Sequence, residues 1–125
     1  MWTSMRRWAL PIAGGLLLIL IAWWWIDLTR GEPKPFVKPA IVEGRNLQVN
    51  YTGSYCQDGS RLDVEERTDQ VVVTVYAWEY PTGCDDRGVP YTLTATLSDD
   101  LGSRAVVDGA CKVPKLQRYT DCLER

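Results

Sequence analysis

The chain has 125 residues, a formal net charge of −2 and no histidine. A chain of this length holds about one domain. Without histidine, the common zinc sites, the Ser-His and Cys-His nucleophile pairs and the usual neutral-pH general base are excluded. These absences remove most hydrolase mechanisms, so we expect a protein that is not an enzyme and that holds no metal and no cofactor.

Charge is divided unevenly along the chain. Residues 1–40 carry five basic and two acidic side chains, whereas residues 41–125 carry nine basic and fourteen acidic ones. Binding to nucleic acid requires a basic face for the phosphates, so we expect no nucleic-acid partner. An acidic module that follows a basic stretch suits a domain outside the cytoplasm, close to an anionic bilayer.

Residues 8–26, WALPIAGGLLLILIAWWWI, contain no charged residue. As an α-helix this segment would be about 28 Å long, close to the hydrocarbon thickness of a bilayer. Trp8 at one end and Trp23, Trp24 and Trp25 at the other fit the aromatic belts of the two membrane interfaces. The segment is therefore predicted to be an uncleaved transmembrane signal anchor with the lipid bilayer as its partner. A cleaved signal peptide is the competing interpretation, but its apolar run is shorter and ends in small residues.

The orientation of this anchor follows from two observations that agree. Arg6 and Arg7 precede the apolar run, which favours a cytoplasmic N-terminus over residues 1–7. All four cysteines lie C-terminal to the run, and disulfides form on the oxidising side of a membrane. We therefore expect a single-pass protein of the cell membrane with an extracytoplasmic C-terminal domain.

The cysteines, Cys56, Cys84, Cys111 and Cys122, are predicted to form two disulfides. Of the three possible connectivities, Cys56–Cys84 with Cys111–Cys122 is favoured because each pair brackets a compact stretch. Each bridge would stabilise the fold by roughly 3–4 kcal/mol. A zinc ion held by four thiolates is the alternative, but zinc sites normally have cysteines two to four residues apart, and none here are so close.

Between the anchor and the domain, residues 27–40 contain Pro33, Pro35 and Pro39. This composition predicts a semi-rigid polyproline-like stem, which would lift the domain by up to roughly 40 Å. The folded domain is then expected over residues 41–125.

Alternation of apolar and polar residues dominates this predicted domain. It is visible in residues 47–52, 62–65, 71–80, 91–97 and 104–107, and turn residues separate these stretches. No stretch shows a convincing helical period. The pattern predicts an all-β fold, a small immunoglobulin-like antiparallel β-sandwich preceded by a single transmembrane α-helix.

Tyr76, Trp78 and Tyr80 fall on one face of the strongest predicted strand. If that face is exposed, it forms a stacking platform for a glycan or the binding surface for a partner. The alternative, which we favour, places Tyr76 and Trp78 in the core with the valines of the same strand facing away. It is favoured because the only phenylalanine, Phe36, lies in the predicted stem and leaves the core without other aromatic bulk.

Two acidic pairs, Asp85-Asp86 and Asp99-Asp100, lie in predicted loops. Loop carboxylates are ligands for calcium, and paired carboxylates serve as the acid and nucleophile of glycosidases. No spacing here matches a known calcium loop and no pocket is implied, so solvated loops are the preferred interpretation over a histidine-free carboxylate enzyme.

A resemblance to a known group of proteins rests on four stretches of the sequence. They are YCQDG at 55–59, LDV at 62–64, CDDRG at 84–88 and LGSRAVVDGA at 101–110. Together they resemble a group of uncharacterised actinobacterial small membrane-anchored or exported proteins. The resemblance covers roughly residues 47–110 and implies a bacterial cell envelope and a Cys56–Cys84 bridge. It implies no activity. The function expected from the sequence is an extracytoplasmic interaction module, an accessory subunit of a membrane or envelope complex, with ligand or glycan recognition as the alternative.

Overall fold

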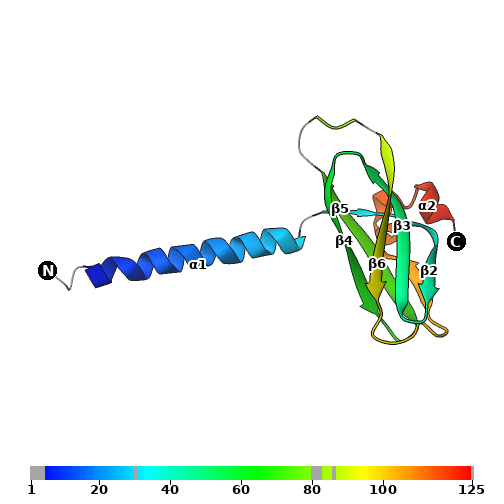
Figure 1. The fold of residues 1–125 in the computed structure, drawn as a ribbon, viewed down its shortest axis with the longest axis horizontal. Helices are drawn as coiled ribbons and strands as arrows, with labels where there is room; N and C mark the ends of the chain where they lie inside the picture. Colours follow the sequence, from blue (N-terminus) through cyan, green and yellow to red (C-terminus); the bar gives the residue numbers. More distant parts are fainter. Residues whose placement is uncertain (1–4, 30, 80–82, 86, 125) are drawn as a thin grey trace. The chain divides into compact units, whose positions relative to one another are not determined.

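The computed structural model describes residues 5–29, 31–79, 83–85 and 87–124, with the backbone alone for residues 5–13 and 27–29. The chain divides into two compact units, residues 1–30 and residues 31–125. Helix α1 (Met5–Thr29) forms the first unit, and the second is a β-domain with short helices at its C-terminal end (Figure 1).

Helix α1 confirms that residues 8–26 are helical. Every side chain from residue 14 to residue 26 is exposed, and ten large apolar side chains among them have exposed fractions of 44–73%. In the described part of the chain, no helix has the combination of length and apolar character that crossing a membrane requires. The structure therefore does not confirm the predicted transmembrane span, of which residues 8–13 have no described side chains.

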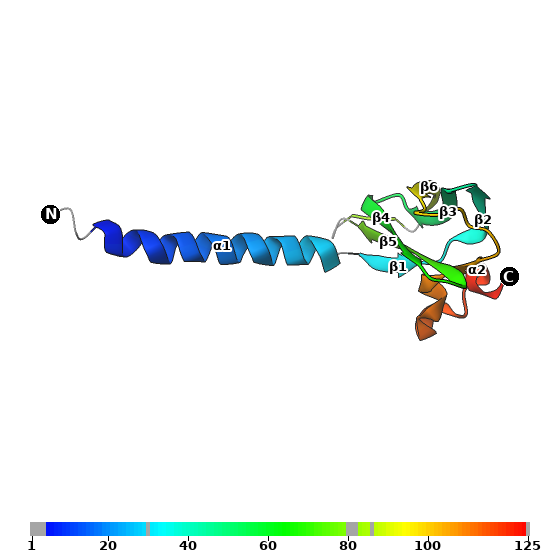
Figure 2. The same ribbon diagram turned by 90° about the horizontal axis from the view of Figure 1, so that it is seen from below.

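Two sheets form the β-domain. Sheet A comprises β1 (Glu32–Lys34), β5 (Gln70–Glu79) and β4 (Gln57–Glu66) in that order, with β7 (Ala105–Asp108) also paired to β5. Sheet B comprises β2 (Val37–Glu43), β3 (Asn46–Ser54) and β6 (Gly88–Thr96). Figure 2 shows the two sheets as separate layers. The prediction of a β-sandwich is correct. The fold is not wholly antiparallel, because β7 runs parallel to β5.

The predicted Pro-rich stem over residues 27–40 is wrong for its C-terminal part. Residues 32–34 form β1, which pairs with residues 75–77 of β5, and β2 begins at Val37. The domain thus starts at Gly31 and not at Ile41. Proline is compatible with these strands because β1 is a short strand at the edge of sheet A, and because the pairing of β2 with β3 shifts register around Pro39.

The core lies between the sheets. Sheet A contributes alternate residues of β5, sheet B contributes alternate residues of β3, and two further side chains come from the segments before β2 and after β6. The fully or nearly fully buried members are Phe36, Leu47, Val49, Tyr51, Val71, Val73, Val75, Ala77 and Leu97. Phe36, assigned to the stem by the sequence, is 1% exposed.

The end of the domain is tied to its beginning by a buried carboxylate. Asp108, which is 5% exposed, accepts hydrogen bonds from the backbone N–H of Phe36 and of Ala110, both at 3.0 Å. Its Oδ2 atom lies 2.7 Å from Nζ of Lys38. Lys38 also donates to the carbonyl oxygen of Phe36. Because Phe36 and Lys38 lie at the start of the domain and Asp108 near its end, this network fixes the entry and the exit of the domain to each other.

After β7 the chain forms the short helices η1 (Gly109–Lys112), η2 (Pro114–Leu116) and α2 (Thr120–Leu123). η1 and η2 lie on the side of sheet A that faces away from sheet B (Figure 2), whereas the carbonyl oxygen of Asp121 in α2 accepts a hydrogen bond from the Lys38 ammonium of β2. Gly109 packs directly on Thr74, since a Cβ atom at Gly109 would come within 2.0 Å of the Thr74 hydroxyl oxygen. The C-terminal segment therefore covers part of the outer face of sheet A and leaves the Tyr76–Trp78 end of β5 beyond it.

Candidate functional site

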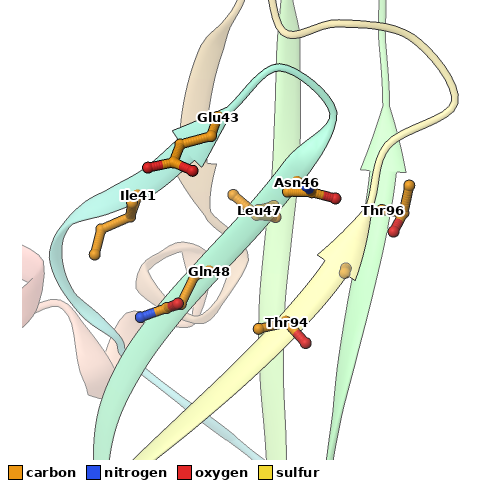
Figure 3. Close-up of a pocket in the computed structure, with 8 residues that line it drawn as sticks. Ile41, Glu43, Asn46, Leu47, Gln48, Thr94 and Thr96 are labelled. Atoms are coloured by element: carbon orange, nitrogen blue, oxygen red, sulfur yellow. The ribbon is translucent and has the colours of Figure 1, made fainter.

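The outer face of sheet B carries a hollow of about 530 Å³. Its walls come from three adjacent strands, β2, β3 and β6 (Figure 3). Strand pairing builds it: Asn46 lies opposite Thr96 and Gln48 lies opposite Thr94, while the alternate residues of β3 point into the core. The lining residues are Ile41, Glu43, Asn46, Leu47, Gln48, Thr94, Ala95 and Thr96.

Hydroxyl and amide groups dominate the chemistry of this hollow. Glu43 provides one carboxylate, and Ile41 is 46% exposed and offers an apolar surface. Just outside the hollow, Asn50 accepts a hydrogen bond of 2.7 Å from the Thr92 hydroxyl across the same strand pair. Such groups suit hydrogen bonding to an uncharged polar surface. A nucleophile with an adjacent base, which acyl or glycosyl transfer requires, is not found among these described lining residues.

Tyr76 and Trp78 lie on the outer face of β5, opposite the core. Val71, Val73, Val75 and Ala77 are the side chains of this strand that belong to the buried core, whereas Tyr76 and Trp78 are half-buried. The favoured sequence interpretation, which placed both aromatic rings in the core, is therefore wrong. Tyr80, the third member of the predicted face, lies outside the described residues.

The rings of Tyr76 and Trp78 pack closely against side chains and backbone of the neighbouring strand β4. Gly59 of β4 lies opposite Trp78, and a Cβ atom at Gly59 would come within 2.5 Å of Trp78 Cζ2. The indole ring therefore occupies the space above β4 that a side chain would otherwise fill. Arg61, opposite Tyr76, places its guanidinium carbon 4.4 Å from the Tyr76 ring centroid, a cation–π contact.

Beside Trp78 is a second hollow of about 490 Å³. It lies between β1 and the end of β5 and is lined by Gly31, Glu32, Lys34, Ala77, Trp78 and Glu79. One ammonium group, two carboxylates and an indole ring thus surround a space at the start of the domain. Sequence reasoning missed this hollow because its β1 side belongs to the segment interpreted as a stem.

The four cysteines come together in the predicted pairs, but only one pair is bonded. Cys111 and Cys122 form a disulfide with a Cα–Cα distance of 5.4 Å. Cys56 and Cys84 are present as thiols. The pKa of the Cys84 thiol is raised to about 11. The largest cause is a side-chain hydrogen bond with Cys56, and desolvation and the nearby charges of Glu79 and Asp85 raise the pKa further. The Cys56–Cys84 disulfide stays a prediction.

The predicted acidic pairs are not gathered at one site. Asp85 forms a 2.8 Å ion pair with Arg87 before β6, and Asp99 follows the end of the same strand. A strand of this length spans roughly 27 Å, far more than the separation that paired catalytic carboxylates need. Asp86 lies outside the described residues. Within the described parts of the chain, no group of three acidic or cysteine side chains has a geometry suited to a metal ion.

Comparison of the chain with protein-family models, with curated proteins and with solved structures returned no match. Function must therefore be argued from the exposed helix and from the surfaces of the β-domain.

Proposed function

We propose that the chain is a membrane-anchored interaction module, which holds its β-domain at the outer face of the cell membrane to bind a membrane or cell-envelope partner. One observation carries this proposal: ten large apolar side chains of α1 are exposed. Burying such a side chain is worth about 1.5–3 kcal/mol. Because 44–73% of each side chain is still exposed, leaving all ten in water forfeits roughly 10–20 kcal/mol, comparable to the whole stability of a typical domain. An apolar medium around residues 8–26 removes this cost.

Two features support the orientation proposed for this anchor. Arg6 and Arg7 precede the apolar segment, which favours retention of the N-terminus in the cytoplasm. The disulfide between Cys111 and Cys122 suits a C-terminal domain in an oxidising compartment. Both features support an extracytoplasmic position for residues 31–125.

The β-domain offers a surface for a partner but no catalytic constellation among its described residues. The polar hollow of sheet B is the surface most open to a protein or an envelope polymer, because the outer face of sheet A is partly covered by the C-terminal segment. An accessory subunit of a larger membrane complex is the role that combines this surface with the anchor.

The anchor is tested by flotation of the full chain with membranes after alkaline carbonate extraction. We expect the unchanged chain to float. A variant with Leu18→Lys and Leu20→Lys should be released, since a lysine near the centre of a membrane helix costs about 2.5–3.5 kcal/mol. Ala22→Leu is the matched control and should float as well. Release of the unchanged chain by carbonate would contradict the proposal.

The partner is tested by affinity purification of the full chain in mild detergent beside a chain that starts at Gly31. The start at Gly31 is required because β1 and β2 belong to the domain. A partner retained by both chains identifies the domain surface as the binding element. Substitution of Gln48→Arg and Thr94→Arg in the sheet B hollow should then abolish capture. If the full chain and the chain that starts at Gly31 still capture the partner when they carry both substitutions, the hollow is not the binding site.

A further inference from the structure

Strand β6 is an edge of sheet B, and among the described strands it pairs only with β3. Hydrogen bonds at the two ends of this pairing show its phase: the N–H of Leu97 donates to the carbonyl of Arg45, and the N–H of Tyr55 donates to the carbonyl of Arg87. The N–H and C=O groups of a strand alternate in direction. The odd-numbered residues of β6 therefore direct these groups to β3, and the even-numbered ones, which include Thr92, Thr94 and Thr96, direct them to the free edge.

The free edge offers three backbone donors, with a limit on each side. Before Thr92, the preceding even-numbered residue is Pro90, which has no N–H group. After Thr96, the next is Ser98, whose N–H donates to Glu66 at 2.8 Å. Within the described residues, the backbone N–H groups of the three threonines have no hydrogen-bond acceptor. The open stretch is thus centred on Thr94, and Pro90 and Ser98 lie at equal distances from it in sequence.

The other described sheet edges carry features that prevent the addition of a strand. Short length, prolines, irregular register and charged side chains all protect an edge. β1 and β7 have three and four residues, β2 shifts register around Pro39, and five of the ten residues of β4 are charged. By contrast, β6 has nine residues, no charged side chain and an unbroken register with β3. It is the described edge best suited to accept another strand.

The donor pattern of this edge is complementary to itself. An antiparallel second copy, related by a twofold axis at Thr94, would place Thr94 opposite Thr94 and Thr92 opposite Thr96, and each pair would exchange two hydrogen bonds. The same register places Pro90 opposite Ser98. The residue that lacks an N–H group then faces the residue whose N–H is already bonded, so no donor meets an empty position.

The side chains of this register are also compatible. On the outer face threonine lies opposite threonine, which is a favourable cross-strand pair, and on the inner face Leu93 lies opposite the small Ala95. Charge on β4, the strand of sheet A that contacts β6, does not oppose the pairing. Asp63, Glu65 and Glu66 each form an ion pair with an arginine of the same copy, and the remaining acid of β4, Asp58, lies at its other end.

We propose that two copies of the chain pair through β6, antiparallel and centred on Thr94, and so join their two sheets B into one continuous sheet. The occupant of this edge is therefore a second copy of the chain, and a strand of a different protein is the competing occupant. The inference rests on the β-domain alone and holds whether or not α1 is embedded in a membrane.

The test is disulfide cross-linking of the full chain in the cells that express it, with Thr94→Cys added to a background of Cys56→Ser and Cys84→Ser. Opposed residues have Cα atoms about 5.5 Å apart, within the range of a disulfide. With copper phenanthroline as the oxidant, we expect a product of twice the mass of the chain. Ile41→Cys, an exposed position on the outer face of β2 at the other edge of sheet B, is the matched control and should give roughly tenfold less product.

The register makes a second demand. Thr92→Cys alone should cross-link poorly, because the two copies of residue 92 would lie about 14 Å apart along the strands. Co-expression of a Thr92→Cys chain with a Thr96→Cys chain should restore the product. Equal yields at positions 94 and 41, or cross-linking of Thr92→Cys alone as strong as that of Thr94→Cys, would overturn the proposal. A Thr94→Cys product of another mass would do the same and would assign the edge to a different protein.

Charge variants that keep all four cysteines test the pairing without cross-linking. Two differently tagged copies of the full chain are expressed together, and one is captured. Thr92→Lys with Thr96→Lys opposes like charges at both outer pairs and should reduce co-capture several-fold. Thr92→Lys with Thr96→Glu opposes unlike charges in the same register and should retain it. Equal co-capture of the two variants contradicts the pairing.

Discussion

Phe36 provides the sharpest test of where the folded domain begins. Its side chain is 1% exposed and belongs to the core cluster, although its sequence neighbourhood predicted an unfolded stem. Truncation of a buried phenylalanine to alanine costs about 3–5 kcal/mol, because the transfer free energy is lost and a cavity remains. Phe36→Ala should therefore remove a large share of a domain stability that is typically 5–15 kcal/mol.

The assay is urea unfolding of the chain that starts at Gly31, followed by the fluorescence of Trp78, which is the only tryptophan of that chain. With an m-value of about 1–3 kcal/mol per molar urea, the unfolding midpoint should fall by roughly 1–5 M. Val37→Ala is the matched control, because Val37 is the adjacent residue and is 41% exposed. Its midpoint should change little. Equal small shifts for both variants would refute the assignment of residues 31–40 to the folded domain.

Further predictions concern buried charge, pH and the thiol pair. Asp108→Ala leaves Lys38 without its carboxylate partner, and we expect a loss of about 3–5 kcal/mol in urea unfolding, which Lys38→Met in the same chain should partly restore. Hydrogen bonds from the loop after β6, the backbone N–H of Ser98 first, hold the pKa of Glu66 below its ordinary value of 4.5. The stability this adds is fully present above pH 4.5 and is lost as pH falls through the lowered pKa, so the deficit of Glu66→Gln in urea unfolding at neutral pH should vanish in acid. For chain isolated from the membrane fraction, we expect Cys56 and Cys84 to resist alkylation until a reductant is added, and mass spectrometry after alkylation checks this.

The sequence located the strands well because alternation is a local property. Residues 47–52, 71–80 and 91–97 were predicted as strands and lie largely within β3, β5 and β6. Alternation separates the two faces of a strand but does not say which face is buried. That choice depends on which other side chains fill the core, and this is a property of the whole fold.

The error at β5 followed from the error at Phe36. Because Phe36 was assigned to a stem, the core was expected to take its aromatic bulk from Tyr76 and Trp78. In the structure, Phe36 and Tyr51 fill that space, and Tyr51 also stacks on Tyr91 with ring centroids 5.5 Å apart. Three prolines in a short segment are typical of an extended stem, but proline is also tolerated in edge strands and at register shifts.

The candidate surfaces depend on pairings between distant parts of the chain, which no local pattern encodes. The hollow of sheet B requires β3 to lie beside β6, although β4 and β5 separate them in sequence. The regular threonines of β6 predicted a polar outer face. Their alignment with the amides of β3 became visible only once the register of the two strands was known.

The loss of the predicted stem narrows the choice of partner. A polyproline-like segment over residues 27–40 would have carried the domain up to roughly 40 Å from the membrane. Instead, Phe36 and Lys38 are pinned to Asp108 at the end of the last strand, and Arg30 and Gly31 are the only residues between α1 and β1. If α1 is embedded as proposed, the partner must come within reach of a domain that no extended stem lifts away from the membrane. A neighbouring membrane protein or an envelope polymer close to the bilayer meets this requirement.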